Sequence, residues 1–466
     1  MLGKSTFPRT WKKARVIPLF KKGDEKEMSN YRPISLLPAL SKVAEKVMTT
    51  QIYRYCESFN LFPKRQFGFR KAKSTSQAVN ELVYEIEKLK QKNATYALVT
   101  VDFSKAFDLI DHKILYQKLI KLGFHKNSIA LIKSYLSDRE QYIEINGKTS
   151  STLTLGEKGS PQGSCISPLL YLIYTIDLQY LLDAHFHIMF ADDTAVLIQI
   201  DKRRETTEKI SLAMEKMYDH FTLNKLKMNL DKTNVQGKNI SGSINLRGTT
   251  IQILDKDSPQ KYLGVWISAN LNWTEHCNQL KKKIRTGLFA LSKLKKLKNK
   301  KLKILIYNAL IKSHLMYSIT AWYPTLTKKQ KNSLHKLQKI AVRLIMGTSK
   351  KSHTGNFFKE LNILKLQDLY ICSVIAQFRS LKSPDNKNNP LTERAVYISR
   401  NTRSQCKLMS KTNAPTIMQH VKIINNYQDI VNSPLTTKTV MKNLIKNLTG
   451  KYNDNCDRPL CYLCLN

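Results

Sequence analysis

The sequence is poor in acidic residues. It contains 35 Asp and Glu against 77 Lys and Arg, which gives a formal net charge of +42 over 466 residues. From His276 to Lys359 there is no acidic residue at all. Such a charge causes strong self-repulsion unless the working partner is a polyanion. The composition therefore points to nucleic acid as the partner, with an acidic membrane surface as the competing interpretation.

The sequence also lacks a hydrophobic run long enough to cross a bilayer comfortably. Its longest apolar run, "SPLLYLIYTIDLQYLL", is short and is interrupted by Asp177. The opening "MLGKSTFPRTWKKARVIPLF" carries scattered charges and has no secretory signal pattern. We therefore expect no membrane partner and an intracellular protein of the nucleus and cytoplasm. The run "KKLKNKKLK" fits either a nuclear-import signal or a solvated helix face.

Cysteine is scarce and scattered, which argues against a disulfide framework. Most of the eight cysteines are isolated, as in reduced intracellular proteins: Cys56, Cys165, Cys277, Cys372 and Cys406. The final "CDRPLCYLCLN" places Cys456, Cys461 and Cys464 at a spacing that suggests a zinc knuckle, but no fourth ligand follows. The distant candidates for a fourth ligand are His420 and Cys406. We therefore expect no zinc cofactor.

The acid-free segment has the pattern of an amphipathic helical unit. The chain is 42% hydrophobic, which argues against wholesale disorder and allows two to four structural units. Apolar residues recur at helical spacing along this segment at Leu280, Ile284, Leu288, Leu291 and Leu294. One face can then pack while the other carries lysines. A solvated helix surface explains any single basic run, but the length of this segment favours a surface that tracks phosphates.

Two acids lie side by side within the apolar stretch "HIMFADDTAVLIQI". Alternation and β-branched content predict strands over 187–190 and 194–200, with Asp192 and Asp193 at the turn between them. One interpretation is that aspartate is simply a good turn residue. The alternative is that a hairpin presents both carboxylates to a cleft.

A third acid could join this pair. The stretch "YALVTVDFSKAFDLIDHKIL" predicts a strand over 96–101 that ends at Asp102, and then a helix beginning near Asp111. Asp108 and Asp111 are interpreted as polar residues at the helix start. Three carboxylates from separate strands repel one another unless cations compensate them, so they suit a site for two Mg²⁺ ions.

At this point the sequence resembles the reverse transcriptases of non-LTR retrotransposons, especially the jockey group. The motifs that carry the resemblance occur in order from Phe7 to Trp273: "TWKKARVIPLFKKGD", "NYRPISLLPALSKVAEK", "QFGFRKAKSTSQAV", "VDFSKAFD", "SPQGSCISPLLY", "FADDTAVLI", "NLDKT" and "KYLGVWIS". The resemblance implies an α+β right-hand polymerase that extends a DNA primer with dNTPs on an RNA template. It implies fingers and palm over 1–273, a basic helical thumb over 274–351, and a mostly helical C-terminal region of unknown role over 352–466.

The resemblance also assigns roles to individual residues. Asp102, Asp192 and Asp193 resemble the catalytic aspartates that hold two Mg²⁺ ions, for which Mn²⁺ could substitute, while a primer 3′-hydroxyl attacks the α-phosphate of a deoxynucleotide. Phe107 matches the bulky position that closes against the sugar 2′-carbon. An ordinary core aromatic is the alternative for Phe107. Arg70 resembles the arginine that grips the triphosphate.

Other basic residues could share the duty of Arg70, namely Lys64, Arg65 and Lys73. Gln162 and Gly163 match the turn that supports the template base and nucleotide, although a plain loop glycine is the usual explanation for a single Gly. Lys232 resembles the lysine suggested to assist the departing pyrophosphate, and in isolation it would be a surface lysine. The "KYLGVWIS" strands resemble the hairpin that holds the primer end, or they are core.

Some features depart from the family pattern. Phe190 stands where many reverse transcriptases carry Tyr, but Phe is familiar among non-LTR enzymes. The chain shows no endonuclease upstream and no ribonuclease H pattern downstream, so we expect a partial element. A catalytically silent relic that only binds nucleic acid is the alternative function. An intron-encoded or telomerase-like enzyme would have different flanking domains, and the motif contexts favour the retrotransposon. The sequence leaves the oligomeric state open.

Overall fold

The computed structural model describes residues 5–104, 107–200, 206–381, 395–398, 407–410, 414–433 and 435–452. Helices and strands are both abundant and are mixed along the chain, so the expected α+β class is confirmed at this level. The chain divides into two compact units. Unit 1 comprises Met1–Lys73, Ala97–Val235 and Ile240–Leu254, and unit 2 comprises Ser74–Tyr96, Gln236–Asn239 and Asp255–Asn466. The predicted domain boundaries at 273 and 351 stay a prediction.

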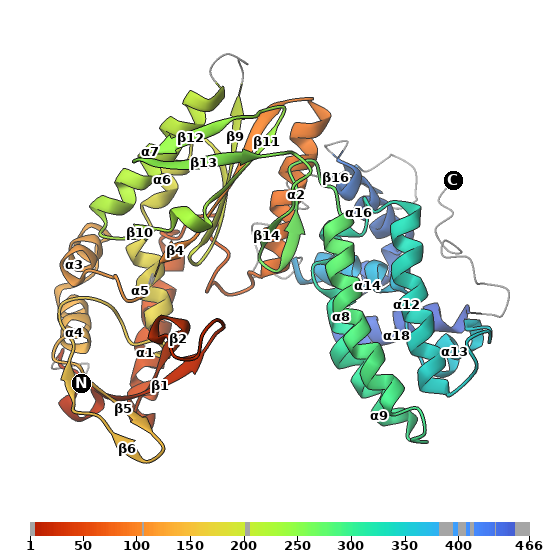
Figure 1. Ribbon diagram of the computed structural model, residues 1–466, viewed down its shortest axis with the longest axis horizontal. Coiled ribbons are helices and arrows are strands. Elements are labelled where there is room, and N and C mark those ends of the chain that lie inside the picture. Colours follow the sequence, from red (N-terminus) through yellow and green to blue (C-terminus); the bar gives the residue numbers. More distant parts are fainter. Residues whose placement is uncertain are drawn as a thin grey trace. The chain divides into compact units, whose positions relative to one another are not determined.

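The larger sheet of the molecule has six strands (Figure 1). Its strand order is β12 (Ser243–Leu246), β13 (Thr249–Leu254), β11 (Asn234–Lys238), β3 (Thr95–Val101), β9 (Asp193–Ile200) and β8 (Phe186–Phe190). Strands β3 and β9 are central and are buried almost throughout, as their continuous apolar sequences require. Asp102 follows the end of β3 and Asp193 begins β9, so these two neighbouring strands are the scaffold on which the site is built.

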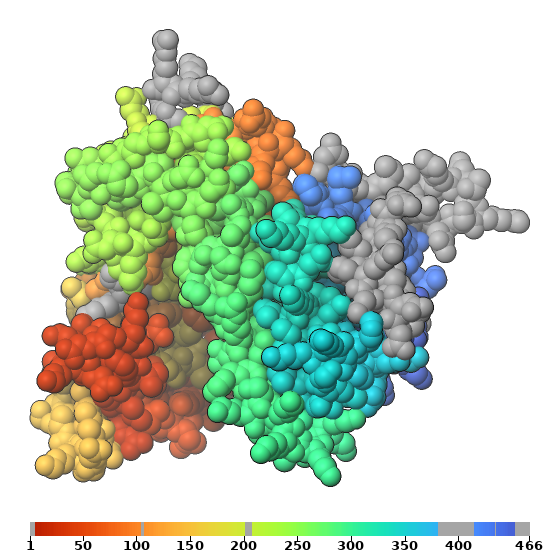
Figure 2. Space-filling view, turned by 45° about the vertical axis from the view of Figure 1, so that its right-hand side comes forward, coloured from red at the N-terminus to blue at the C-terminus, as the bar shows by residue number. Residues whose placement is uncertain are grey.

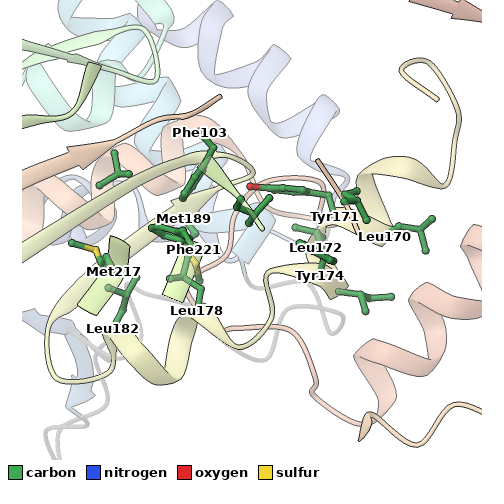
Figure 3. Packing of buried hydrophobic residues seen from close by; sticks show 14 of the residues in the cluster. Phe103, Leu170, Tyr171, Leu172, Tyr174, Leu178, Leu182, Met189, Met217 and Phe221 are labelled. Carbon is green, nitrogen blue, oxygen red and sulfur yellow. The ribbon is translucent and has the colours of Figure 1, made fainter. Parts of the chain in front are cut away.

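Helices of unit 1 pack on this sheet around a single core. They are α3 (His112–Lys121), α4 (Lys126–Leu136), α5 (Ser167–Tyr174), α6 (Leu178–Leu182) and α7 (Thr206–Leu223). Figure 3 shows residues of α5 and α6 packed with Met189, Met217 and Phe221. The long apolar run of the sequence forms α5 and α6, and its apolar character is explained by this burial. Among the helices described here, none is both long and apolar enough to cross a membrane.

A second sheet in unit 1 packs with a long helix. Its strands are β1 (Lys13–Phe20), β2 (Tyr31–Leu36), β5 (Glu140–Ile145), β6 (Lys148–Thr149) and β7 (Leu153–Thr154), in the order β2-β1-β5-β6 with β7 on β5. Strand β1 is antiparallel to β2 and parallel to β5. Helix α1 (Ala39–Ser58) follows β2 and buries Ala44, Met48 and Ile52 in the unit 1 core. Strand β2 leads directly to the functional site, as described below.

Unit 2 is mainly helical. Its longer helices are α2 (Thr75–Gln91), α8 (Thr274–Lys293), α9 (Lys300–Tyr307), α12 (Lys328–Met346), α14 (Leu366–Leu381), α16 (Pro415–Asn426) and α18 (Thr437–Gly450), and the short α10 (Ser313–Met316), α11 (Ile319–Trp322), α13 (Gly355–Glu360) and α17 (Gln428–Val431) lie between them. Two hairpins accompany the helices: β14 (Gln260–Tyr262) with β15 (Val265–Ile267), and β16 (Ala395–Ile398) with β17 (Lys407–Ser410).

The amphipathic pattern predicted for the acid-free segment is confirmed in helix α8. Leu280, Ile284 and Leu291 are buried, and the lysines and Arg285 lie on the remaining surface. Helix α8 packs against α9 and α12, and Figure 2 shows the outer surface of this part of the chain (green to cyan) open to solvent. Because the segment contains no acid, its lysines have no partner carboxylate within the segment itself.

Candidate active site

The two adjacent aspartates lie at the tip of a tight hairpin, as predicted. Strands β8 and β9 pair antiparallel, with Phe190 opposite Asp193, so only Ala191 and Asp192 form the loop. Ala191 has a φ of 57°. A two-residue hairpin loop needs positive φ because only such turns match the twist of the strands. The hairpin therefore holds an alanine in a backbone region that favours glycine, and presents Asp192 and Asp193 beside it.

Asp102 lies at the same end of the sheet. It follows the last residue of β3, and β3 neighbours β9, which begins at Asp193. The three carboxylates influence one another electrostatically. Burial, then Asp192 and Asp102, raise the pKa of Asp193 to about 6. Burial and Asp102 also raise the pKa of Asp192, against the opposing fields of Arg32 and Lys232. The site thus concentrates negative charge where solvent cannot fully screen it.

Lys232 is held next to Asp102 by the short strand β10 (Lys227–Met228). Strand β10 pairs with β4 (Phe103–Ser104), and the amide of Asn229 donates to the Asp102 carbonyl at 3.0 Å. One turn of 3-10 helix then carries Lys232, whose Nζ lies 2.9 Å from Asp102 Oδ2. The lysine is largely exposed, so this ion pair is screened and weak. It leaves Lys232 free to exchange one anionic partner for another.

The donor set fits hard divalent cations. Carboxylate oxygens are the ligands that Mg²⁺ prefers, and burial and mutual repulsion, which raise the pKa of Asp192 and of Asp193, are effects that a bound cation would oppose. Within the described residues, no three His, Cys, Asp or Glu side chains are already gathered in ligand geometry. Asp102 is instead turned to Lys232. Tyr171, from α5, has a buried hydroxyl with no hydrogen-bond partner, and its pKa is raised by burial and by the three aspartates.

The predicted sugar-gate residue lies above this buried tyrosine. Phe107 is half-buried, and its ring centroid lies 5.2 Å from that of Tyr171 and 6.1 Å from that of Phe69. The Phe107 carbonyl accepts from the amide of Ser160 at 3.0 Å. Phe107 therefore contacts two other aromatic residues near the carboxylates. One of them, Phe69, is exposed.

Asp108 differs from its predicted role. Asp111 caps α3 as expected, since its Oδ1 accepts from the amide of Ile114 at 3.1 Å. Asp108, however, lies in the turn before the helix and accepts from Gln162 Nε2 at 2.8 Å. Helix α3 begins at His112, too far along the chain for Asp108 to act on its dipole. The carboxylate of Asp108 instead orients the side chain of Gln162.

Gln162 and Gly163 contact the edge of the second sheet. The amide of Ser35, in β2, donates to the Gln162 carbonyl at 2.7 Å. Gly163 has a φ of 115°, and a Cβ there would lie 2.8 Å from the Ser35 carbonyl oxygen. Both the backbone conformation and the close approach require glycine at this position. The same turn is held from behind by Glu45, which is fully buried and accepts from the amide of Cys165 at 2.8 Å.

Arg70 is paired within the protein. Its guanidinium makes a bidentate pair with Glu57, donates to the Pro63 carbonyl at 2.8 Å, and lies over the ring of Phe62. The sequence predicted that the guanidinium of Arg70 binds a triphosphate. In this structure the Glu57 carboxylate is bonded to guanidinium nitrogens that a phosphate would need. The nearby Lys64 and Arg65 are exposed.

Sequence reasoning missed three residues that support the site. Arg32 lies in "NYRPIS", a motif to which no residue role was assigned, and its charge opposes the raised pKa of Asp192. Glu45 and Gln66 are buried polar residues inside otherwise apolar surroundings. The one feature of the sequence that could have indicated Glu45 and Gln66 is a polar residue at a position where a buried apolar residue is expected. Buried polar groups need partners, so each one marks a structural contact.

Gln66 joins the chain segment 65–69 to the β8–β9 hairpin. Its Oε1 accepts from the amides of Ala191 at 3.1 Å and Gly68 at 2.8 Å. The amide of Phe67 donates to the Met189 carbonyl at 2.7 Å. A Cβ at Gly68 would lie 2.2 Å from the Ala191 nitrogen, so only glycine fits. The segment and the hairpin are therefore one structural element.

Outside unit 1, the β14–β15 hairpin of unit 2 carries the "KYLGVWIS" motif. Its turn residues Leu263 and Gly264 have φ values of 45° and 80°. The hydroxyl of Tyr317 donates to the Leu263 carbonyl at 2.6 Å, and its ring lies against Gly264. The turn is thus attached to a residue of the helical segment.

The cysteine prediction lies mostly outside the described residues, which do not include Cys406, Cys456, Cys461 or Cys464. The distant candidate His420 is fully buried. One of its ring nitrogens contacts the Tyr84 hydroxyl at 2.9 Å and the other the Thr320 carbonyl at 3.2 Å. Both nitrogens are therefore engaged within unit 2.

Comparison with known proteins adds independent findings. Residues 20–267 match the family described as reverse transcriptase (RNA-dependent DNA polymerase). The RNA-directed DNA polymerase from mobile element jockey of Drosophila melanogaster is 28% identical over 383 residues, which cover 78% of this chain and 40% of that protein. The probable RNA-directed DNA polymerase from transposon BS of Drosophila melanogaster is 28% identical over 382 residues, with coverage of 78% and 41%. The chain spans about two fifths of the length of these relatives.

Among solved structures, telomerase from Candida tropicalis in complex with a fragment of telomeric RNA is 9% identical. It covers 94% of this chain and 65% of that chain, with a TM-score of 0.42.

Proposed function

The chain belongs to the reverse transcriptase (RNA-dependent DNA polymerase) family, and on this premise we propose that it is the polymerase portion of a non-LTR retrotransposon. The resemblance drawn from the motifs is confirmed by the family match and by the jockey relatives. The proposed reaction extends the 3′-hydroxyl of a DNA primer with dNTPs on an RNA template. One observation carries the proposal: Asp102, Asp192 and Asp193 lie together at one end of the neighbouring strands β3 and β9, in a shared field that raises the pKa of Asp192 and of Asp193.

Reverse transcriptases use divalent metal ions, and we propose Mg²⁺, with Mn²⁺ as a possible substitute. Asp102, Asp192 and Asp193 would hold the ions. When bound, such ions activate the attacking hydroxyl and stabilise the leaving oxygen. The 3′-hydroxyl would give up its proton to solvent as its oxygen bonds to the α-phosphorus, and the bond from the α-phosphorus to pyrophosphate would break. Release of Asp102 from Lys232 would free one carboxylate for this role.

The remaining site residues would bind and orient the nucleotide. Phe107 would exclude a ribose 2′-hydroxyl by contact with the sugar. Gln162 and Gly163 would support the base pair, because the turn is held firmly by Asp108 and β2. Lys232, whose side chain is largely exposed, would assist the departing pyrophosphate. Arg70 would reach the triphosphate only after leaving Glu57, so a fully ionised triphosphate must compete with that bidentate pair.

The basic helices would bind the template–primer. We propose the right-hand arrangement with fingers and palm in 1–273, the thumb in 274–351, and the C-terminal region in 352–466. The exposed lysines of α8, α9 and α12 support this, since no acid within their segment competes with phosphates. Binding should weaken steeply with salt because counterions are released when lysines contact phosphates.

Primer extension tests the proposal. The purified chain should extend a DNA primer on an RNA template with Mg²⁺, and EDTA should abolish extension. Asp192→Asn should lower the rate by roughly 1000-fold, because it removes an oxygen ligand at the point of charge development. Asp183→Asn, at an exposed position after α6, is the matched control and should leave the rate unchanged. Absent extension with salt-sensitive RNA binding would instead support the silent binding relic.

A further inference from the structure

Phe69 combines two unfavourable features. Its backbone φ is 56°, in a region where a bulky residue is an outlier, and its ring is 48% exposed. Neither backbone strain nor an exposed aromatic ring helps the chain fold. Such strain persists only when the surrounding structure over-determines it, and it clusters at functional sites.

The surroundings of Phe69 hold it in this conformation. The preceding residue, Gly68, lies directly against the backbone of Ala191, and Gln66 accepts from both of their amides. The next residue, Arg70, is anchored by Glu57. Phe69 is therefore carried between two fixed points, one of which is the catalytic hairpin itself.

The ring of Phe69 is directed at Phe107. The two ring centroids lie 6.1 Å apart with an interplanar angle of 73°, which is an edge-to-face contact. Phe107 also packs on the buried Tyr171, whose hydroxyl points toward Phe103 in Figure 3. Phe107 thus contacts one buried ring and one exposed residue.

We infer that Phe69 is a positioning residue for nucleotide selection: it presses Phe107 into the orientation that excludes ribonucleotides. The inference rests on the proposed polymerase function. Because Phe107 is only half-buried and Phe69 is one of the rings that contact it, loss of the Phe69 ring leaves Phe107 free to move away from the sugar. A ribose 2′-hydroxyl then finds room.

The test is the ratio of kcat/KM for a dNTP to kcat/KM for the matching rNTP, measured with Mg²⁺ on one template–primer. Phe69→Leu should lower this ratio by about tenfold, the scale of one aromatic pair. Phe69→Gly should lower it by a similar factor, although glycine relieves the backbone strain. Phe59→Leu is the matched control, since Phe59 is also exposed but packs on Tyr55 away from the site. It should leave the ratio unchanged.

A double-mutant cycle shows whether Phe69 acts through Phe107. In a Phe107→Leu background the gate is already open, so adding Phe69→Leu should change the ratio by less than about twofold. An unchanged ratio in the single Phe69→Leu variant, with the parent polymerising normally, overturns the inference alone. A lower ratio in Phe69→Gly but not in Phe69→Leu also overturns it, because backbone mobility would then be the cause. A parent that does not polymerise overturns the proposed function as well.

Discussion

Replacing Asp193 by Asn should stabilise the metal-free protein while it removes polymerase activity. The pKa of Asp193 is raised from 3.8 to about 6, first by burial and then by Asp192 and Asp102. Above pH 6 the carboxylate is ionised in both the folded and the unfolded state. The folded state then contains an ionised Asp193 in an unfavourable environment. The wild-type side chain therefore lowers the free energy of unfolding at neutral pH.

The size of the effect follows from the pKa difference. A rise of about two pH units corresponds to about 3 kcal/mol of disfavoured charge. Although its carboxyl group is partly desolvated, Asp193 as a residue is exposed at the hairpin tip, and solvent screening reduces this to roughly 1 kcal/mol. As pH falls through 6 the folded state takes up a proton and the unfolded state does not, so this penalty disappears between about pH 6 and pH 4. Asn has no such dependence.

The measurement is amide hydrogen exchange of β8 and β9 in EDTA, because it reports the opening free energy of this unit rather than of the whole chain. At pH 7.5 the Asp193→Asn variant should be more protected than the parent by about 1 kcal/mol, and at pH 4.5 this difference should have fallen to less than about half. Asp183→Asn is the surface control and should match the parent at both pH values. Equal protection of Asp193→Asn and the parent at pH 7.5 would refute the electrostatic reasoning. Mg²⁺ should stabilise the parent and leave Asp193→Asn largely unaffected.

Two further contacts can be tested by single substitutions. Gln66→Leu removes the acceptor of the buried Ala191 amide, so we expect a loss of about 1–3 kcal/mol in the hydrogen-exchange stability of the β8–β9 hairpin and at least about tenfold slower primer extension; unchanged exchange at Ala191 would contradict this. Tyr317→Phe removes the hydroxyl that holds the Leu263 carbonyl, so we expect the KM for template–primer to rise about threefold to tenfold with little change in single-turnover rate. A lower single-turnover rate at unchanged KM would contradict the assigned role of Tyr317.

The elements with strong periodicity could be predicted from sequence. The strands over 187–190 and 194–200, the cap at Asp111 and the apolar face of α8 were all predicted and are confirmed. In each of these elements, the residue types that the local sequence pattern favours are also the ones that the folded structure requires at those positions. The same reasoning predicted Asp192 and Asp193 at the hairpin tip, and the structure shortens the loop to Ala191 and Asp192, because Asp193 is the first residue of β9.

The contacts of polar side chains could not be predicted in the same way. Arg70 carries a charge and lies in a recognisable motif, but its pairing with Glu57 depends on how α1 packs against the segment that follows it. The position of Asp108 likewise depends on a turn that brings Gln162 to it from 54 residues away. Sequence spacing constrains neighbours on one element, whereas these contacts join elements that only tertiary structure brings together.

Gln66, which sequence reasoning missed, stabilises several unfavourable features of the site. Adjacent aspartates repel one another, Ala191 and Phe69 adopt positive φ, and a residue larger than Gly68 does not fit. Each feature opposes folding, and all of them meet at one hairpin. Gln66 bonds to the backbone of that hairpin, so a single buried amide supports the strained turn and the segment that carries the aromatic ring. A substitution at Gln66 should therefore disturb metal binding and sugar selection together, whereas Asp193→Asn and Phe69→Leu should each disturb only one of them.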